Sequence, residues 1–96
     1  MAAVLVTSSV KVYSGVCIDT QCSLGFCAEH AAIAEMLKNR ESRIAMVVAV
    51  DKTGAILPPC GRCRELMWQV DPTNASRDVV IGKDAVVKLS QLLPFR

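Results

Sequence analysis

Residues 59–63 read Pro-Cys-Gly-Arg-Cys, and residues 27–29 read Cys-Ala-Glu. Cys60 and Cys63 are three positions apart, so on the first turn of a helix both sulfurs point to one side. Cys27 stands at the start of another expected helix, and a helix N-terminus lowers the pKa of a thiol and favours the thiolate. Three thiolates at two helix starts predict a Zn²⁺ site whose ligands are Cys27, Cys60 and Cys63.

These three ligands leave one zinc position open, and that position separates two kinds of site. A structural zinc site is closed by four protein ligands, whereas a catalytic site keeps a place for water. Zinc lowers the pKa of bound water to about 7. Glu29 follows a ligand by two residues, so its carboxylate can take a proton from that water. The sequence therefore predicts Glu29 as a catalytic residue, and the alternative is a structural site closed by Cys17 or Cys22.

Apolar patterns around the two motifs predict a single domain spanning residues 1–96. The stretches expected to form strands are 2–6, 10–16, 44–50 and 79–81. The first two of these form an antiparallel hairpin, and helical spacing predicts helices over 27–39 and 63–70. Residues 86–93 are expected to form a strand, a helical turn, or one followed by the other. This order implies a layered α/β sandwich with a mixed sheet.

The composition restricts the classes of function. Apolar residues make up 52% of the 96 residues and charged residues 21%, which predicts a packed core and excludes disorder. The net charge of +2 is spread along the chain and only four residues are aromatic, so no nucleic-acid partner is expected. No stretch approaches the roughly 20 apolar residues that span a bilayer, and no signal peptide is visible. We therefore expect a cytoplasmic protein without membrane contact, whose five cysteines serve metal binding or catalysis rather than disulfides.

The two motifs, in this order in one chain, resemble the signature of the zinc-dependent nucleoside and nucleobase deaminases, Cys/His-x-Glu followed by Pro-Cys-x-x-Cys. The three-cysteine version is most similar to the small cytidine deaminases and blasticidin-S deaminases. Residues 60–67 are close to the second metal-binding helix of those proteins, and Leu-Leu-Pro at residues 92–94 is close to their final segment. The resemblance covers nearly the whole chain and implies a three-layer α/β/α sandwich with a mixed central sheet.

The same resemblance implies a role for each matching residue. Cys27, Cys60 and Cys63 are expected to hold Zn²⁺, with Glu29 as the proton shuttle. Hydroxide would attack C4 of a cytosine-like ring, and ammonia would leave. The implied function is the hydrolytic deamination of cytidine or deoxycytidine to uridine or deoxyuridine.

Further residues are expected near the substrate. The backbone near Ala28 and the carbonyl of Pro58 would contact the amino group, and Arg64 would donate a hydrogen bond to a thiolate. The family usually carries Asn-x-Glu at the end of its second strand to hold ribose hydroxyls, whereas this chain carries Cys17 and Asp19 there. Asp19 can accept from a hydroxyl, but a thiol does not replace an amide. A modified or antibiotic nucleoside is therefore the alternative substrate.

Two other features differ from the family pattern. His30 stands where members often have Arg, and the sequence begins inside the first strand. We therefore expect the helix that precedes this strand in relatives, and covers the sheet, to be missing. An open sheet face and a small chain predict a homo-oligomer, as the small three-cysteine relatives form homotetramers. A catalytically silent, zinc-stabilised oligomerisation module is the non-enzymatic alternative.

Overall fold

A hairpin forms one edge of the sheet. The computed structural model describes residues 1–21 and 24–95. Strand β1 (Ala2–Thr7) pairs antiparallel with β2 (Val12–Val16), which confirms the predicted hairpin. Val10, in the turn between these strands, has a φ of 65° and a side chain that is 81% exposed. A β-branched residue rarely adopts this left-handed conformation, so the turn carries backbone strain.

Strand β3 (Ile44–Val50) is the central strand of the sheet and pairs with three other strands. It pairs antiparallel with β1 and parallel with β5 (Asp78–Gly82), and its C-terminal end pairs with the short β4 (Ile56–Leu57). β5 in turn pairs with β6 (Ala85–Lys88), so the order is β2-β1-β3-β5-β6 with β4 beside β3. The sheet is mixed, as predicted, but β4 was not expected from the sequence.

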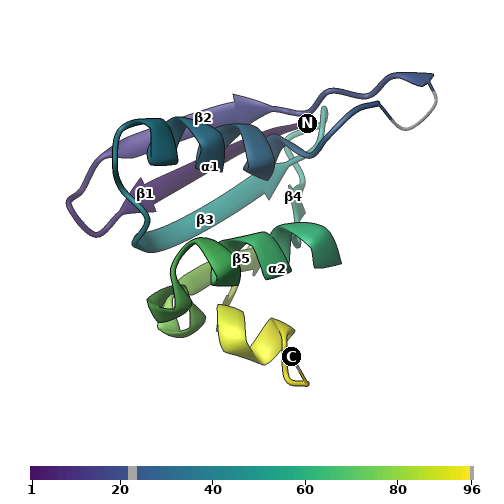
Figure 1. Ribbon diagram of the computed structural model, residues 1–96. Helices are drawn as coiled ribbons and strands as arrows, with labels where there is room; N and C mark the ends of the chain where they lie inside the picture. Colours follow the sequence, from purple (N-terminus) through teal and green to yellow (C-terminus); the bar gives the residue numbers. More distant parts are fainter. Residues whose placement is uncertain (22–23, 96) are drawn as a thin grey trace.

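Two α-helices, α1 (Ala28–Lys38) and α2 (Gly61–Val70), lie on one face of this sheet (Figure 1). The 3₁₀-helix η2 (Pro72–Ser76) follows α2, and η3 (Leu89–Leu92) follows β6. The C-terminal stretch is thus a strand followed by a helical turn. The predicted α/β class with a mixed sheet is confirmed. Residues 1–21 and 24–95 supply the sheet and one of the two expected helical layers.

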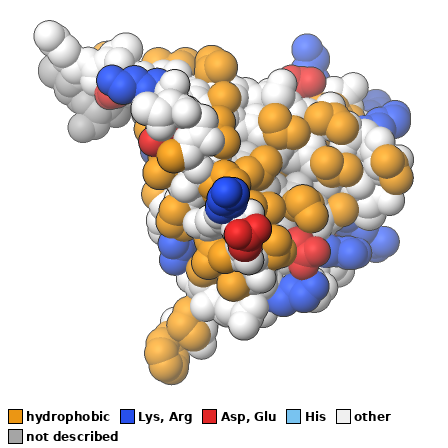
Figure 2. All heavy atoms as spheres, turned by 180° about the vertical axis from the view of Figure 1, so that it is seen from behind, with side chains coloured by type: hydrophobic (Ala, Val, Ile, Leu, Met, Phe, Trp, Pro, Cys, Tyr) orange, Lys and Arg blue, Asp and Glu red, His pale blue; other side chains and the backbone are white. Residues whose placement is uncertain are grey.

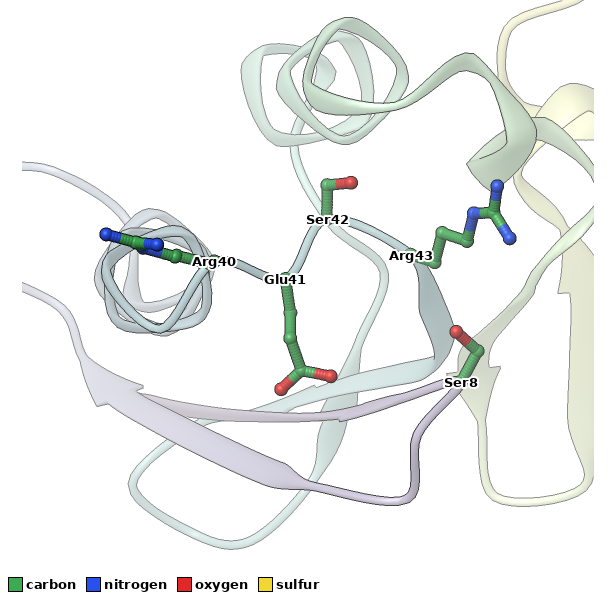
Figure 3. A pocket seen from close by; sticks show the side chains of 5 residues that line it. All are labelled: Ser8, Arg40, Glu41, Ser42 and Arg43. Carbon is green, nitrogen blue, oxygen red and sulfur yellow. The ribbon is translucent and has the colours of Figure 1, made fainter.

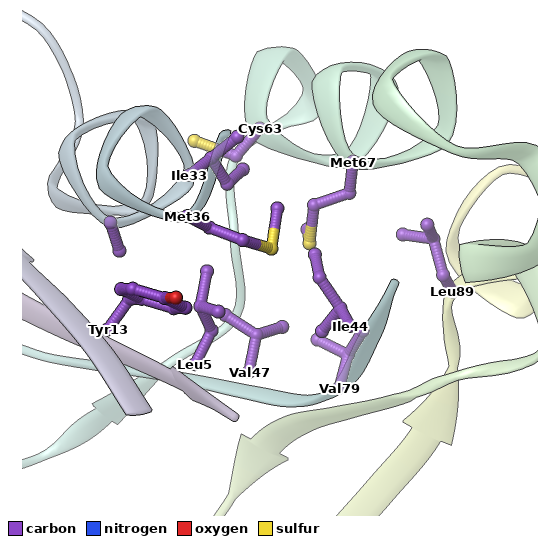
Figure 4. Packing of buried hydrophobic residues seen from close by; sticks show 11 residues of the cluster. Leu5, Tyr13, Ile33, Met36, Ile44, Val47, Cys63, Met67, Val79 and Leu89 are labelled. Atoms are coloured by element: carbon purple, nitrogen blue, oxygen red, sulfur yellow. The ribbon is translucent and has the colours of Figure 1, made fainter. Parts of the chain in front are cut away.

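The core lies between the two helices and the sheet (Figure 4). Leu5, Val47 and Val79 point up from the three central strands, and Met36 and Met67 point down from α1 and α2. Each of these side chains is at most 2% exposed, and burying one contributes about 1.5–3 kcal/mol. Because both helices pack on this one core, their N-terminal ends are held at fixed positions above the sheet.

Helix α1 lies unusually close to strand β2 at Gly15. A Cβ atom on Gly15 would be 2.5 Å from the Cβ of Ala31 and 2.7 Å from the carbonyl oxygen of Ala28. Real Cβ atoms do not approach other atoms this closely, so glycine is required for this helix position. The contact lies one turn from the start of α1, and it therefore sets the height of that start above the sheet.

The opposite face of the sheet is apolar and uncovered by the described residues (Figure 2). Neighbouring strands pair Val4 with Val48 and Val6 with Met46, so aliphatic side chains lie next to one another on this face. Five members of this face are between 38% and 64% exposed: Val4, Val12, Val16, Met46 and Val86. The open sheet face expected from the sequence is present in the described part of the chain.

Candidate functional site

The two helices begin at cysteines of nearly identical backbone conformation. Cys27 is the N-cap of α1, with φ −72° and ψ 154°, and Cys60 is the N-cap of α2, with φ −68° and ψ 167°. An N-cap side chain usually accepts a hydrogen bond from a free backbone N–H of the first turn. Neither thiol makes such a bond. Both sulfurs are therefore left free for another partner.

The sulfurs of the two helix starts converge. Cys27 Sγ lies 3.4 Å from Cys60 Sγ, and Cys60 Sγ lies 3.4 Å from Cys63 Sγ. Two sulfurs bound to one tetrahedral zinc at about 2.3 Å are separated by about 3.8 Å. The three thiols thus fit Zn²⁺ after shifts of a few tenths of an ångström. Cys60 is exposed and Cys63 is buried, so the site opens on the Cys60 side.

The three thiols differ in acidity. Burial raises the pKa of the Cys27 thiol and of the Cys63 thiol; the Cys60 thiol adds to the rise at both, whereas the Cys63 thiol acts against it at Cys27. At Cys60 burial also acts to raise the pKa, but it is outweighed by nearby backbone N–H groups of Cys63 and Arg62, which form no capping hydrogen bond with the sulfur, and by the thiols of Cys63 and Cys27. The helix N-terminus thus acts as predicted at Cys60, which supplies the most accessible thiolate, but not at Cys27.

Glu29 lies in the first turn of α1, and its side chain is only 7% exposed. It lines a cavity together with Cys27 and Cys60. Within the described residues, its carboxylate accepts no hydrogen bond from the protein. Among the described side chains, the fully buried polar atom without a partner is Arg77 Nε, so the Glu29 oxygens keep access to the cavity. The carboxylate is therefore available for a molecule in the cavity.

The cavity has a volume of about 120 Å³ and lies where α1, β3 and the segment after β4 meet. Its lining residues are Met1, Cys27, Ala28, Glu29, Ala49, Leu57, Pro58 and Cys60. Strand β4 explains this shape, because its pairing with the end of β3 brings Leu57 and Pro58 beside the sulfurs. The unpredicted strand is thus the element that forms one wall of the site.

The expected substrate contacts divide into two groups. Ala28 and Pro58 line the cavity, whereas Cys17 and Asp19 do not. Cys17 packs against the cluster of Ala3, Ala28 and Ala49, and Asp19 is exposed. Closure of the metal site by Cys17 has no support in this arrangement. Cys22, the other candidate for that position, lies outside the described residues.

Arg64 does not reach a sulfur, contrary to the expectation. Its Nε donates a hydrogen bond to the carbonyl of Pro59 at 2.8 Å, and its Nη1 donates to the carbonyl of Leu92 at 3.5 Å. The guanidinium therefore connects the residue that precedes Cys60 with the C-terminal segment. Arg64 thus fixes the position of the segment that leads into Cys60, and it does not neutralise a thiolate.

His30 is the group beside the sulfurs to which the sequence assigned no role. Its Nδ1 lies 3.4 Å from Cys63 Sγ. The side chains of His30, Cys27 and Cys63 could hold a metal ion together, because their ligand atoms all lie within 4.8 Å of one another. Burial lowers the pKa of His30, and Arg62 adds to this shift. The sequence feature that could have identified His30 is its position three residues after Cys27, at the start of a helix.

A second cavity, of about 250 Å³, lies at the other end of the sheet (Figure 3). It is lined by Ser8, Arg40, Glu41, Ser42 and Arg43. The Glu41 carboxylate accepts hydrogen bonds from the hydroxyls of Tyr13 and Ser9. Ser42 and Arg43 both contact Asp71. The polar groups here connect elements of the fold and indicate no chemistry.

Known proteins resemble the chain over nearly its whole length. The family model of the cytidine and deoxycytidylate deaminase zinc-binding region matches residues 1–82. The crystal structure of cytidine deaminase from Mycobacterium leprae has a TM-score of 0.87 and 28% identity, over 97% of this chain and 76% of that one. The cytidine deaminase from Burkholderia pseudomallei gives a TM-score of 0.75 and 28% identity, over 98% and 78%.

The fold is also that of cytidine deaminase from Mycobacterium tuberculosis, with a TM-score of 0.87 at 24% identity over 98% of this chain and 75% of that one.

Helices of residues 1–21 and 24–95 are all too short or too polar to cross a membrane.

Proposed function

Since the chain belongs to the cytidine and deoxycytidylate deaminase zinc-binding family, we propose that it hydrolyses the exocyclic amino group of a cytosine-type nucleoside. Cytidine or deoxycytidine and water would give uridine or deoxyuridine and ammonia. The observation that carries this proposal is the Glu29 carboxylate, buried, without a protein partner, and in one cavity with two of three convergent thiols. A carboxylate in this position can act on a molecule in the cavity.

The metal supplies one part of the chemistry. Zn²⁺ fits the donor set of Cys27, Cys60 and Cys63, and when bound it acts as a Lewis acid that makes water acidic enough to yield hydroxide near neutral pH. Arg64 supports this part by fixing the Pro59 carbonyl, which sets the direction from which Cys60 enters α2.

Glu29 carries the proton transfers. Its carboxylate takes a proton from water and gives it to the substrate, so that oxygen adds at C4 and the bond from C4 to the amino nitrogen breaks. The nitrogen leaves as ammonia. Such a group needs access to both water and substrate, and the position of Glu29 in the cavity lining provides it.

The cavity walls orient the ring. The Pro58 carbonyl is an acceptor for the amino group of the substrate, and Ala28 lines the same cavity. Ala49 and Leu57 add apolar lining of the kind that binds a flat ring. Cys17 and Asp19 lie outside this lining, so a modified or antibiotic nucleoside is kept as the alternative substrate.

Ammonia release from zinc-loaded protein tests the proposal. A panel would contain cytidine, deoxycytidine, cytosine and modified aminated nucleosides, with Glu29→Gln as the blank. Release from any member that disappears in Glu29→Gln supports a deaminase and names its substrate. Silence across the panel from protein with one zinc per chain would contradict an enzymatic role and favour a zinc-stabilised oligomerisation module.

We also propose that the protein acts as a homo-oligomer in the cytoplasm. The support is the apolar face of the sheet (Figure 2). Five strands spaced about 4.8 Å apart, each with about five residues that rise about 3.3 Å per residue, give this face a projected area of about 400 Å². The largest exposed apolar patch of a typical monomer covers about 300–600 Å² and often has a function, so this face is a candidate contact surface. Light scattering after size exclusion would show the oligomer, and a stable monomer at micromolar concentration would contradict it.

A further inference from the structure

His30 connects the two helices that carry the metal ligands. It lies in the first turn of α1, and its Nδ1 is 3.4 Å from the sulfur of Cys63 on α2. The ring also contacts the side chain of Phe26, with centroids 6.3 Å apart and planes tilted by 53°. The imidazole is thus placed by one aromatic neighbour on one side and by a sulfur on the other.

Cys63 needs such a partner more than the other two cysteines do. Its side chain is fully buried, so water does not reach its sulfur, whereas Cys60 is exposed. In the described residues, Cys63 Sγ lies 3.4 Å from the thiol of Cys60 and 3.4 Å from Nδ1 of His30. The imidazole of His30 is thus placed on α1 where a ring N–H can donate to this sulfur.

We propose that His30 is a positioning residue, whose Nδ1–H donates a hydrogen bond to the Cys63 sulfur and so retains the metal. The bond requires a proton on Nδ1, so in the neutral ring Nε2 carries none. It holds the Cys63 side chain in its ligating rotamer and disperses part of the negative charge that three thiolates leave around one Zn²⁺. The inference rests on the zinc site of the proposed function.

Groups on α2 face the outer side of the ring. His30 lines a surface groove of about 350 Å³ together with Arg62, Glu65, Leu66 and Gln69. Arg62 and Glu29 are the charged groups that act on the imidazole. The groove gives solvent access to the ring, so replacing His30 leaves a space that water fills and does not open a cavity in the core.

The test compares His30→Ala with His30→Asn. The Asn side-chain amide has its N–H close to the position of Nδ1, so His30→Asn keeps a donor, whereas His30→Ala removes it. The measured quantity is the rate at which zinc passes to an excess of a chromogenic chelator. We expect His30→Ala to raise this rate about 10- to 100-fold, and His30→Asn to stay within about threefold of the unchanged protein. Gln69→Ala, in the same groove, should have no effect.

Cobalt substitution separates a donor from a ligand. With His30 as a donor, the thiolate-to-cobalt absorption bands and the tetrahedral visible bands keep their intensities in both variants. Loss of those bands in His30→Ala and His30→Asn alike would show His30 to be a metal ligand and overturn the proposal. An unchanged zinc release rate in His30→Ala would overturn it as well. Neither readout requires a substrate, so a failure of the deamination assay leaves this result intact.

Discussion

The starts of α1 and α2 have almost the same backbone and different chemistry. Both begin at a cysteine N-cap in extended conformation, and neither sulfur caps its own helix. The α2 start supplies two sulfurs, and its backbone N–H groups lower the pKa of Cys60. The α1 start supplies one sulfur, that of Cys27, and burial raises the pKa of its thiol. It also supplies Glu29 and His30. The α2 start is thus suited to hold a metal, and the α1 start to move protons next to it.

This comparison also shows a cost. Ser, Thr, Asp and Asn at an N-cap stabilise a helix by about 0.5–2 kcal/mol relative to residues that cannot cap. The chain gives up that contribution twice, at two helices of 11 and 10 residues. In the proposed site, zinc binding at Cys27 and Cys60 replaces it, because a metal that binds only the folded state adds its binding free energy to stability.

The largest expected effect is that of Glu29→Gln on the α1 start. Removal of a positioned general acid and base lowers kcat/KM by about 10²–10⁴-fold. The amide is nearly isosteric and does not touch the sulfurs, so zinc content should remain one per chain. Steady-state ammonia release and metal analysis measure the two quantities. Glu35→Gln, on the exposed side of the same helix, is the matched control, and equal losses in both variants would contradict a special role for Glu29.

Serine substitution at the α2 start should separate metal binding from folding. Cys60→Ser and Cys63→Ser each remove a proposed ligand, and zinc affinity should fall by more than about 100-fold in both, as measured by chelator competition. In metal-free protein their effects should have opposite signs. Serine at the Cys60 N-cap gains a cap and adds about 1 kcal/mol. Serine at the buried Cys63 places a hydroxyl in the core and lowers stability by about 1–3 kcal/mol.

Urea unfolding of the metal-free variants, under reducing conditions, gives these two signs. Destabilisation of both variants by similar amounts would show that the Cys60 sulfur already stabilises α2 without metal.

The glycines associated with the two helices should also differ. Gly15→Ala places a Cβ into the contact with Ala31, so we expect a loss of about 1–3 kcal/mol in the free energy of unfolding. Gly61→Ala, in the first turn of α2, meets no atom within 4 Å and should be neutral or stabilise by about 0.4–1 kcal/mol. Denaturant melts of metal-free protein compare them, and a neutral Gly15→Ala would show that α1 can move away from β2 freely.

The smallest effect concerns the far end of α1. The Tyr13 hydroxyl donates to the Glu41 carboxylate at 2.5 Å, and this bond raises the pKa of Tyr13 from 10.0 to about 12. The folded pKa is above the unfolded one, so this contribution to stability is complete below pH 10 and disappears as the pH rises to about 12. The chain has a single tyrosine, so its phenolate absorbance reports this titration alone.

Stability measured across the same interval completes the experiment. Tyr13→Phe should remove the alkaline decrease between pH 10 and 12. An ordinary phenolate titration near pH 10 in the folded protein would refute the assignment.

Local spacing explains what could be predicted from the sequence. Cys60 and Cys63 lie on one helical turn, so their convergence follows from helix geometry alone. Glu29 was found for the same reason, two residues after Cys27. The apolar run of residues 44–50 predicted the central strand with its observed ends. In each case the decisive interactions join residues close together in the chain.

Contacts between distant residues explain what could not be predicted. Arg64 reaches the carbonyl of Leu92, 28 positions away, so its acceptor depends on where the C-terminal segment packs. His30 meets Cys63 across 33 positions and two helices. Strand β4 has two residues, too few for any alternating pattern, and exists because the end of β3 offers it hydrogen bonds. Tertiary packing decides all three.

The strained turn at Val10 has a consequence for engineering. A β-branched residue in the left-handed region costs about 1–2 kcal/mol, which Gly or Asn would avoid. The side chain is 81% exposed and lies in the turn that bonds to Arg43 through the backbone of Ser8, whereas the sulfurs lie at the helix starts. Replacing it therefore adds stability without changing the site. That reserve can offset destabilising substitutions near the cavity, so a variant library for new substrates is best built on a chain whose hairpin turn has been corrected first.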